Sequence, residues 1–89
     1  MDTEQFLQLL HQDGFPEPVE VQQPVNGYLN DHEHPFEVRA LVIQGGITII
    51  TNGQSKAYKV GDIFQLSFKQ PHAESYGPEG VTYLASRKQ

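Results

Sequence analysis

Three of the four histidines in this chain have a spacing that could bind a metal ion. His32 and His34 are one residue apart, and side chains two positions apart on a β-strand point to the same face. Neutral imidazole is the commonest metal ligand in proteins, and His72 offers a third one. The pattern predicts a three-histidine metal site. The alternative is that His32 and His34 are polar residues at a strand end near a loop, and that His72 is a histidine at the barrel mouth bonded to backbone.

Three imidazoles leave coordination positions open, which suits a divalent Fe, Mn, Ni or Zn ion. Such an ion can act as a Lewis acid or activate oxygen or water. We consider Glu37 as a fourth ligand, although strand parity points it away from His32 and His34 unless a bulge re-aims it. Otherwise Glu37 is expected to be a solvated or a salt-bridged carboxylate, with Arg39 as the candidate partner.

The neighbours of the histidines indicate a cavity of mixed apolar and polar character, without an arginine clamp for phosphates or carboxylates. Strand parity puts Glu74 on the same face as His72. Aromatic residues near the motifs are expected to be wall residues rather than catalytic ones. The residues expected to line the substrate pocket are Phe36, Val38, Phe64, Glu74 and Tyr76.

The elements that must position these residues are mainly short strands between residues 19 and 86. Apolar and β-branched runs alternate with turn signals such as Asn26-Gly27 and Asn52-Gly53. Gly45-Gly46 separates two apolar runs and predicts a hairpin turn. Residues 72–76 and 81–86 are predicted as two separate strands, and the last three residues as frayed. Many short strands with regular turns favour an antiparallel barrel or sandwich over a parallel sheet.

One short helix is predicted before the strands, within residues 1–14. Asp2 can cap it, and Gln5 lies three residues later, as in a capping box. Apolar residues at helical spacing follow, and Asp13-Gly14 ends the element. A helix this short is marginal alone and must dock its apolar stripe. The residues of that stripe are Phe6, Leu9 and Leu10.

Length and composition predict one domain spanning residues 1–89 and exclude several classes of function. The net charge is −5 without a basic patch, which argues against nucleic acid as a partner. The absence of cysteine excludes disulfides, thiolate zinc sites and thiol catalysis. We see neither a secretory signal nor a membrane span, so a cytoplasmic protein is expected. A domain this small gains from a bound metal or a homodimer interface.

The sequence resembles the cupin superfamily, which is characterised by two motifs. His32 and His34 match the His-x-His of the first motif, and Gly45 matches its closing glycine. Gly61 matches the opening glycine of the second motif, and His72 falls at its histidine. The resemblance covers about residues 26 to 76. It implies an all-β, antiparallel cupin-type barrel (double-stranded β-helix or jelly roll) with the site in its interior.

The chain departs from the cupin pattern at the metal-binding glutamate. Val38 occupies that position, and Glu37 stands one residue early. Three histidines are therefore what carries over, and some cupin dioxygenases use such a set for iron. The resemblance implies a divalent transition metal without fixing its identity.

Two functions remain open, beside a barrel that a metal merely stabilises. The first is a metal-dependent enzyme acting on a small molecule, dioxygenase-like or of the isomerase type. The second is a non-enzymatic module that binds or senses a small molecule or a metal. Turnover that is lost on chelation would indicate the enzyme, whereas stabilisation by a ligand that is not consumed would indicate the binding module. The substrate cannot be read from the sequence.

Overall fold

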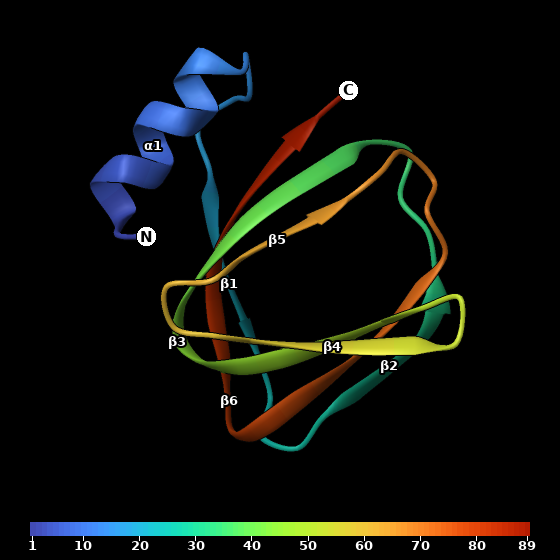
Figure 1. The fold of residues 1–89 in the computed structure, drawn as a ribbon. Helices are drawn as coiled ribbons and strands as arrows, with labels where there is room; N and C mark the ends of the chain where they lie inside the picture. The colour runs from blue at the N-terminus through green and yellow to red at the C-terminus, as the bar shows by residue number, and fades with distance from the viewer.

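The computed structural model describes all residues, 1–89, and shows an antiparallel β-structure preceded by one helix (Figure 1). This confirms the fold class predicted from the sequence. The elements, in chain order, are α1 (Thr3–Gln12), β1 (Val19–Gln23), β2 (Tyr28–His32), β3 (Glu37–Thr51), β4 (Gln54–Lys59), β5 (Ile63–Leu66) and β6 (His72–Lys88).

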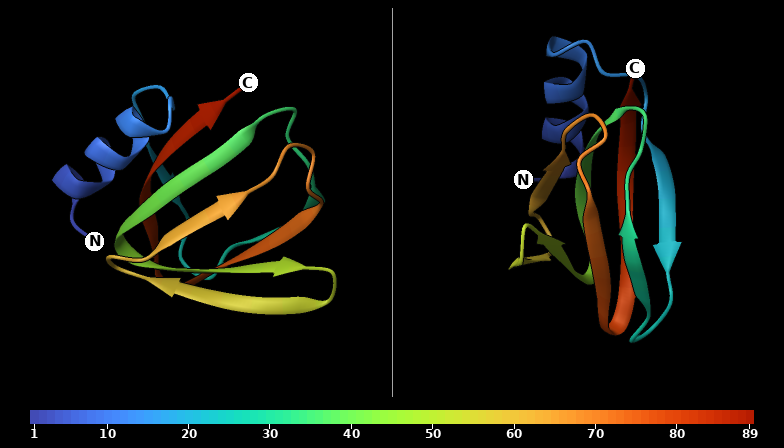
Figure 2. Two further views of the ribbon diagram at one scale, coloured as in Figure 1. Left: turned by 45° about the horizontal axis from the view of Figure 1, so that its top comes forward. Right: turned by 90° about the vertical axis from the view of Figure 1, so that its right-hand side faces the viewer.

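The strands form two facing layers that share the two longest strands, β3 and β6 (Figure 2). In one layer, the first part of β3 pairs with the end of β6, and β1 and β5 flank them. In the other layer, the last part of β3 pairs with the start of β6, and β2 and β4 flank them. All these pairs are antiparallel. The shared strands join the two layers, which gives the jelly-roll arrangement.

The predicted hairpin at Gly45-Gly46 is wrong, because β3 continues through both glycines and passes from one layer to the other there. The register between β3 and β6 shifts at this point, between Val42 and Gln44 and again between Gly45 and Ile47. Gly45 has φ 71°, a value that favours glycine and lets the strand bend without ending.

The two strands predicted at residues 72–76 and 81–86 are likewise one strand, β6, which extends to Lys88. Gly80, with φ 70°, lies in the bend between its two parts. In both long strands, glycine at positive φ thus marks the bend from one layer to the other and not a chain reversal. The chain end is paired rather than frayed, since Arg87 lies opposite Val38 in the ladder.

The core lies between the two layers, and α1 covers the outside of one of them. Alternate residues of β3, such as Val38, Ala40 and Val42, are buried in the inner cluster. Leu41 points to the other face, where Phe6 and Leu10 of the helix bury it. This explains why β3 is apolar on both faces. The predicted capping box between Asp2 and Gln5 is present at the helix start.

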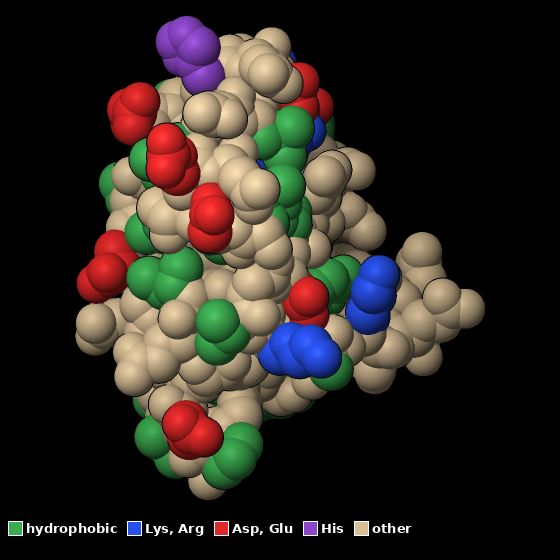
Figure 3. All heavy atoms as spheres, turned by 60° about the vertical axis from the view of Figure 1, so that its left-hand side comes forward, with side chains coloured by type: hydrophobic (Ala, Val, Ile, Leu, Met, Phe, Trp, Pro, Cys, Tyr) green, Lys and Arg blue, Asp and Glu red, His purple; other side chains and the backbone are tan.

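The outer surface carries more acidic than basic side chains on the face shown in Figure 3, in keeping with the net charge of −5. The only helix, α1, is too short and too polar to cross a bilayer.

Candidate metal centre

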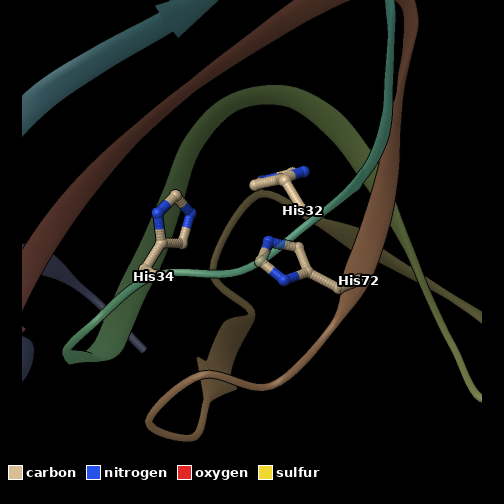
Figure 4. A group of neighbouring side chains, drawn as sticks. All are labelled: His32, His34 and His72. Atoms are coloured by element: carbon tan, nitrogen blue, oxygen red, sulfur yellow. The ribbon is translucent and has the colours of Figure 1, made fainter.

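The three histidines singled out in the sequence come together at one end of the barrel (Figure 4). Their candidate ligand atoms all lie within 4.8 Å of one another. His32 ends β2 and His72 begins β6, and the two residues lie opposite each other in the ladder. His34 follows in the loop between β2 and β3. Both residues of the His-x-His pair were expected on a strand, but the strand ends at His32, and the loop turns His34 toward the same point.

Backbone carbonyls orient two of the three imidazoles. His32 Nδ1 lies 2.8 Å from the carbonyl oxygen of Asn30, and His72 Nδ1 lies 2.9 Å from that of Gln70. Because a carbonyl can only accept, each Nδ1 carries the proton and each Nε2 presents a lone pair in the neutral ring. Metal-ligating histidines commonly have this outer hydrogen bond.

The Nε2 atom of His72 gives a direct test of whether these residues fit a metal. His72 is almost fully buried, and in the neutral ring its Nε2 lone pair has no hydrogen-bond donor, because the neighbouring Glu74 Oε2, 3.2 Å away, is itself an acceptor. A buried polar atom without a partner costs free energy, so native structures rarely leave one. A cation held by the three imidazoles would satisfy this lone pair, and the donor set therefore fits a divalent transition metal.

A buried carboxylate, Glu74, lies beside the histidines. Its Oε2 is 3.2 Å from His72 Nε2 and 3.7 Å from His32 Nε2. Its other oxygen, Oε1, accepts a 2.8 Å hydrogen bond from the Tyr76 hydroxyl. One oxygen is thus fixed by Tyr76, while the other faces the imidazoles. Glu74 is the carboxylate that the fold brings to this site.

The ionisable groups in this cluster shift one another's pKa values. Burial tends to raise the pKa of Glu74, but its interactions with His72 and Tyr76 prevail and hold that pKa below the usual value. Burial tends to lower the pKa of His72, but Glu74 and the carbonyl of Gln70 raise it above 6.5. Burial, together with the neighbouring histidines, lowers the pKa of His34. Burial and the bond to Glu74 raise the pKa of Tyr76, which therefore stays a donor.

These shifts predict that metal affinity falls as the pH is lowered. Metal binding requires neutral rings, and the raised pKa of His72 means that a proton competes with the metal even somewhat above pH 6.5. His34 has a lowered pKa and competes less. We expect the affinity for Zn(II), measured against a chromophoric chelator, to fall about tenfold per pH unit for each proton displaced. An affinity that is unchanged between about pH 8 and pH 6 would contradict this expectation.

A cavity of about 510 Å³ opens beside the histidines. It includes Phe36, Val38, Phe64 and Glu74, as expected from the sequence. Tyr76 is not part of its lining but belongs to the core, where it bonds to Glu74. The full set of lining residues is Val21, Gln23, Leu29, His32, His34, Phe36, Val38, Phe64, Leu66, Glu74, Tyr83, Ala85 and Arg87.

Glu37 is not brought to the histidines. It is exposed at the start of β3 and lines a different, smaller cavity, whereas its neighbour Val38 faces the histidine cavity. The physical reason is strand parity, because no bulge lies at this end of β3. Arg39, proposed as its partner, instead pairs with Asp13. The carboxylate beside the histidines is therefore Glu74 of β6 and not Glu37 of β3.

Sequence reasoning missed the part of the lining that β1 and the end of β6 provide. Tyr83, Ala85 and Arg87 alternate along β6 and face the cavity. Arg87 corrects the expectation of a cavity without an arginine. The alternation of residues 83, 85 and 87 could have placed them on one face of a strand, but a frayed chain end is predicted from the sequence from residue 87 on.

Solved structures match most of this chain. A protein with a double-stranded β-helix domain from Klebsiella pneumoniae superposes with a TM-score of 0.67 and 25% identity, covering 81% of this chain and 67% of that one. An RmlC-like cupin from Shewanella frigidimarina superposes with a TM-score of 0.69 and 18% identity, covering 80% and 63%. The chain has the cupin fold. The resemblance inferred from the two histidine motifs is therefore confirmed for the fold.

By sequence, the chain matches no family model and no curated protein. A DMSP lyase from Ruegeria pomeroyi has the same cupin fold, with a TM-score of 0.71 and 21% identity over 79% of this chain and 36% of that one. This chain spans less than two thirds of the Shewanella and Ruegeria proteins. At these identities the likeness concerns the fold and does not extend to an activity.

Proposed function

We propose that this cupin barrel binds a divalent transition metal through His32, His34 and His72 and acts as a metal-dependent enzyme on a small molecule. The observation that carries the proposal is the buried, unpartnered Nε2 of His72, which lies within a cluster of three imidazoles. A bound ion would supply Lewis acidity or oxygen activation, as in an isomerase or a dioxygenase. Its identity is open among Fe, Mn, Ni and Zn.

The residues around the histidines have distinct parts in this proposal. The carbonyls of Asn30 and Gln70 hold two rings in the orientation that presents Nε2. Glu74 adds a negative charge that favours a cation, and Tyr76 fixes the position of this carboxylate. The apolar lining of the cavity, including Phe36 and Phe64, excludes water around a small molecule.

Replacing Glu74 tests this account of the site. We expect Glu74→Gln to weaken Zn(II) or Co(II) binding by about 10- to 100-fold, because a neighbouring anion and its hydrogen bonds are lost. The visible spectrum of the Co(II) form should change as well. Calorimetric titration of the purified variant measures the affinity.

Glu37→Gln is the matched control, since it removes the same charge from an exposed position outside the cavity. It should bind metal like the parent. Equal metal affinity in the two variants would show that Glu74 has no part in the site.

A non-enzymatic binding or sensing module is the alternative, and one observation favours it. Glu74 Oε1 accepts a hydrogen bond from Tyr76, and Oε2 lies 3.2 Å from His72 Nε2, so no carboxylate at the site faces open space in which to act as an acid or base. Chelation distinguishes the two functions. An enzyme loses turnover on chelation and regains it with one metal, whereas a binding module is stabilised by a ligand that it does not consume.

Two further parts of the proposal concern assembly and location. We propose that the protein is cytoplasmic and that it forms a homodimer. The homodimer is favoured because a chain of this size gains stability from an interface. Two apolar side chains, Val25 in the turn before β2 and Tyr28 at its start, are exposed and suit such an interface. Light scattering of the purified protein tests the dimer, and the mass of a single chain would contradict it.

A further inference from the structure

The cavity beside the histidines has one cationic side chain in its lining, Arg87. It stands near the end of β6, two residues beyond Ala85 and four beyond Tyr83, which also face the cavity. Its backbone pairs with Val38 of β3, which lines the same cavity. The regular ladder therefore fixes where this side chain begins, although the residue is exposed.

The guanidinium of Arg87 has no carboxylate partner. The three ion pairs in the structure join His32 and His72 to Glu74, and Arg39 to Asp13. The other arginine of the chain, Arg39, is thus used structurally, and it also packs on Phe15. Arg87 keeps its five N–H donors available.

Arg87 is held close to the histidines through one aromatic ring. Its guanidinium carbon lies 5.8 Å from the centre of the Phe36 ring. On the same ring stacks His34, with a centre-to-centre distance of 5.0 Å and an angle of 14° between planes. Arg87 and the candidate metal ligand His34 thus both contact Phe36, and both line the cavity.

The charge balance of the cavity favours an anionic ligand. Glu74 contributes one negative charge and Arg87 one positive charge, so a divalent ion bound by neutral imidazoles leaves an excess of two positive charges. The chain as a whole has a net charge of −5, and acidic side chains are spread over the face shown in Figure 3. The cavity is therefore the place where an anion finds complementary charge.

We propose that the cavity takes a small organic carboxylate, held by a two-point hydrogen bond from Arg87, while a second oxygen of the same molecule reaches the metal at the histidines. The inference rests on the proposed metal site and adds a substrate class to it. A planar guanidinium matches a carboxylate with two parallel hydrogen bonds. A single arginine suits one carboxylate better than a phosphate dianion. Gln23 and Tyr83 line the cavity and offer polar groups to the rest of the molecule.

Linear dicarboxylates of increasing length test the proposal, because one acid group can reach the metal and the other Arg87. The probes are malonate, succinate, glutarate and adipate, titrated by calorimetry into the Zn(II)-loaded protein, with butanoate as a probe that has one acid group only. One chain length should bind about tenfold or more tightly than butanoate. Arg87→Gln should reduce this affinity to that of butanoate, and Arg87→Lys should retain part of it.

Lys56→Gln is the matched control, since Lys56 lies over Tyr58 of β4 and is not part of the cavity lining. It should bind the dicarboxylate like the parent. Metal content is measured on every variant first. A parent that binds no metal would overturn the proposed function and this inference together. Metal-loaded Arg87→Gln that binds the best dicarboxylate as tightly as the parent would overturn the inference alone.

Discussion

Replacing His72 with alanine should reduce metal affinity more than about 100-fold, because loss of an outer hydrogen-bonding partner alone commonly costs 10- to 100-fold. His72 is the most buried of the three candidate ligands, and its Nε2 faces Glu74 and the other imidazoles. No other nitrogen ligand lies in the cavity lining to replace it. Titration with Zn(II) or Ni(II), followed by calorimetry, measures the loss.

Two further variants separate the loss of a ligand from the loss of the fold. His72→Ala also removes a buried side chain and its bond to Gln70, so it can destabilise the protein. His34→Ala removes a ligand that is only partly buried and has no backbone hydrogen bond of this kind. It should keep the fold and still lose metal. His11→Ala, on the exposed face of α1, should bind metal like the parent; equal binding by His34→Ala and the parent would contradict the three-histidine site.

Gly45→Ala is expected to unfold the protein or nearly so. A Cβ at this position would collide with the carbonyl oxygen of Gly80, where β3 and β6 cross between the layers. The φ of 71° adds about 1–2 kcal/mol of strain for any L-residue other than glycine. Relief of the clash requires two backbones to separate, so the total cost approaches the roughly 5 kcal/mol that stabilises a small domain.

Gly53→Ala is the control for the backbone strain. Gly53 has a similar φ of 76°, but nothing lies within 4 Å of an added Cβ. Its cost should be limited to about 1–2 kcal/mol. Urea denaturation of both variants measures the difference, and equal midpoints would show that the contact between Gly45 and Gly80 does not limit the fold.

The alternation of apolar residues predicted most strands, because a buried inner face imposes a period of two on the sequence. The alternation could not predict whether a strand ends at a glycine or continues through it into the other layer. A hairpin turn and a bend between layers both use glycine at positive φ, so Gly45-Gly46 has the same appearance in either case. The choice depends on the partner, β6, whose Gly80 lies against Gly45 and is distant in sequence.

The candidate site was predictable in its histidines and less so in its charged residues. The spacing of His32, His34 and His72 identified the cluster, since each position is set by a motif. The carboxylate was sought on β3, where the family pattern has it, but Glu74 reaches the cluster from β6. Strand alternation predicts that Glu74 shares a face with His72. That Glu74 also lies near His32 depends on the pairing of β2 with β6, which the sequence alone does not reveal. Arg87 was missed because a chain end was assumed to be unpaired.

The measurement that tests the central claim most directly is the metal content of the protein, purified without an affinity tag or a chelator. Elemental analysis should find close to one divalent transition metal ion per chain, and apo protein should take up the same amount on reconstitution. The identity of the metal would then select the assay, with iron directing it to oxygen uptake. A protein that contains no metal and takes up none would contradict the account, and the buried Nε2 of His72 would then need another partner.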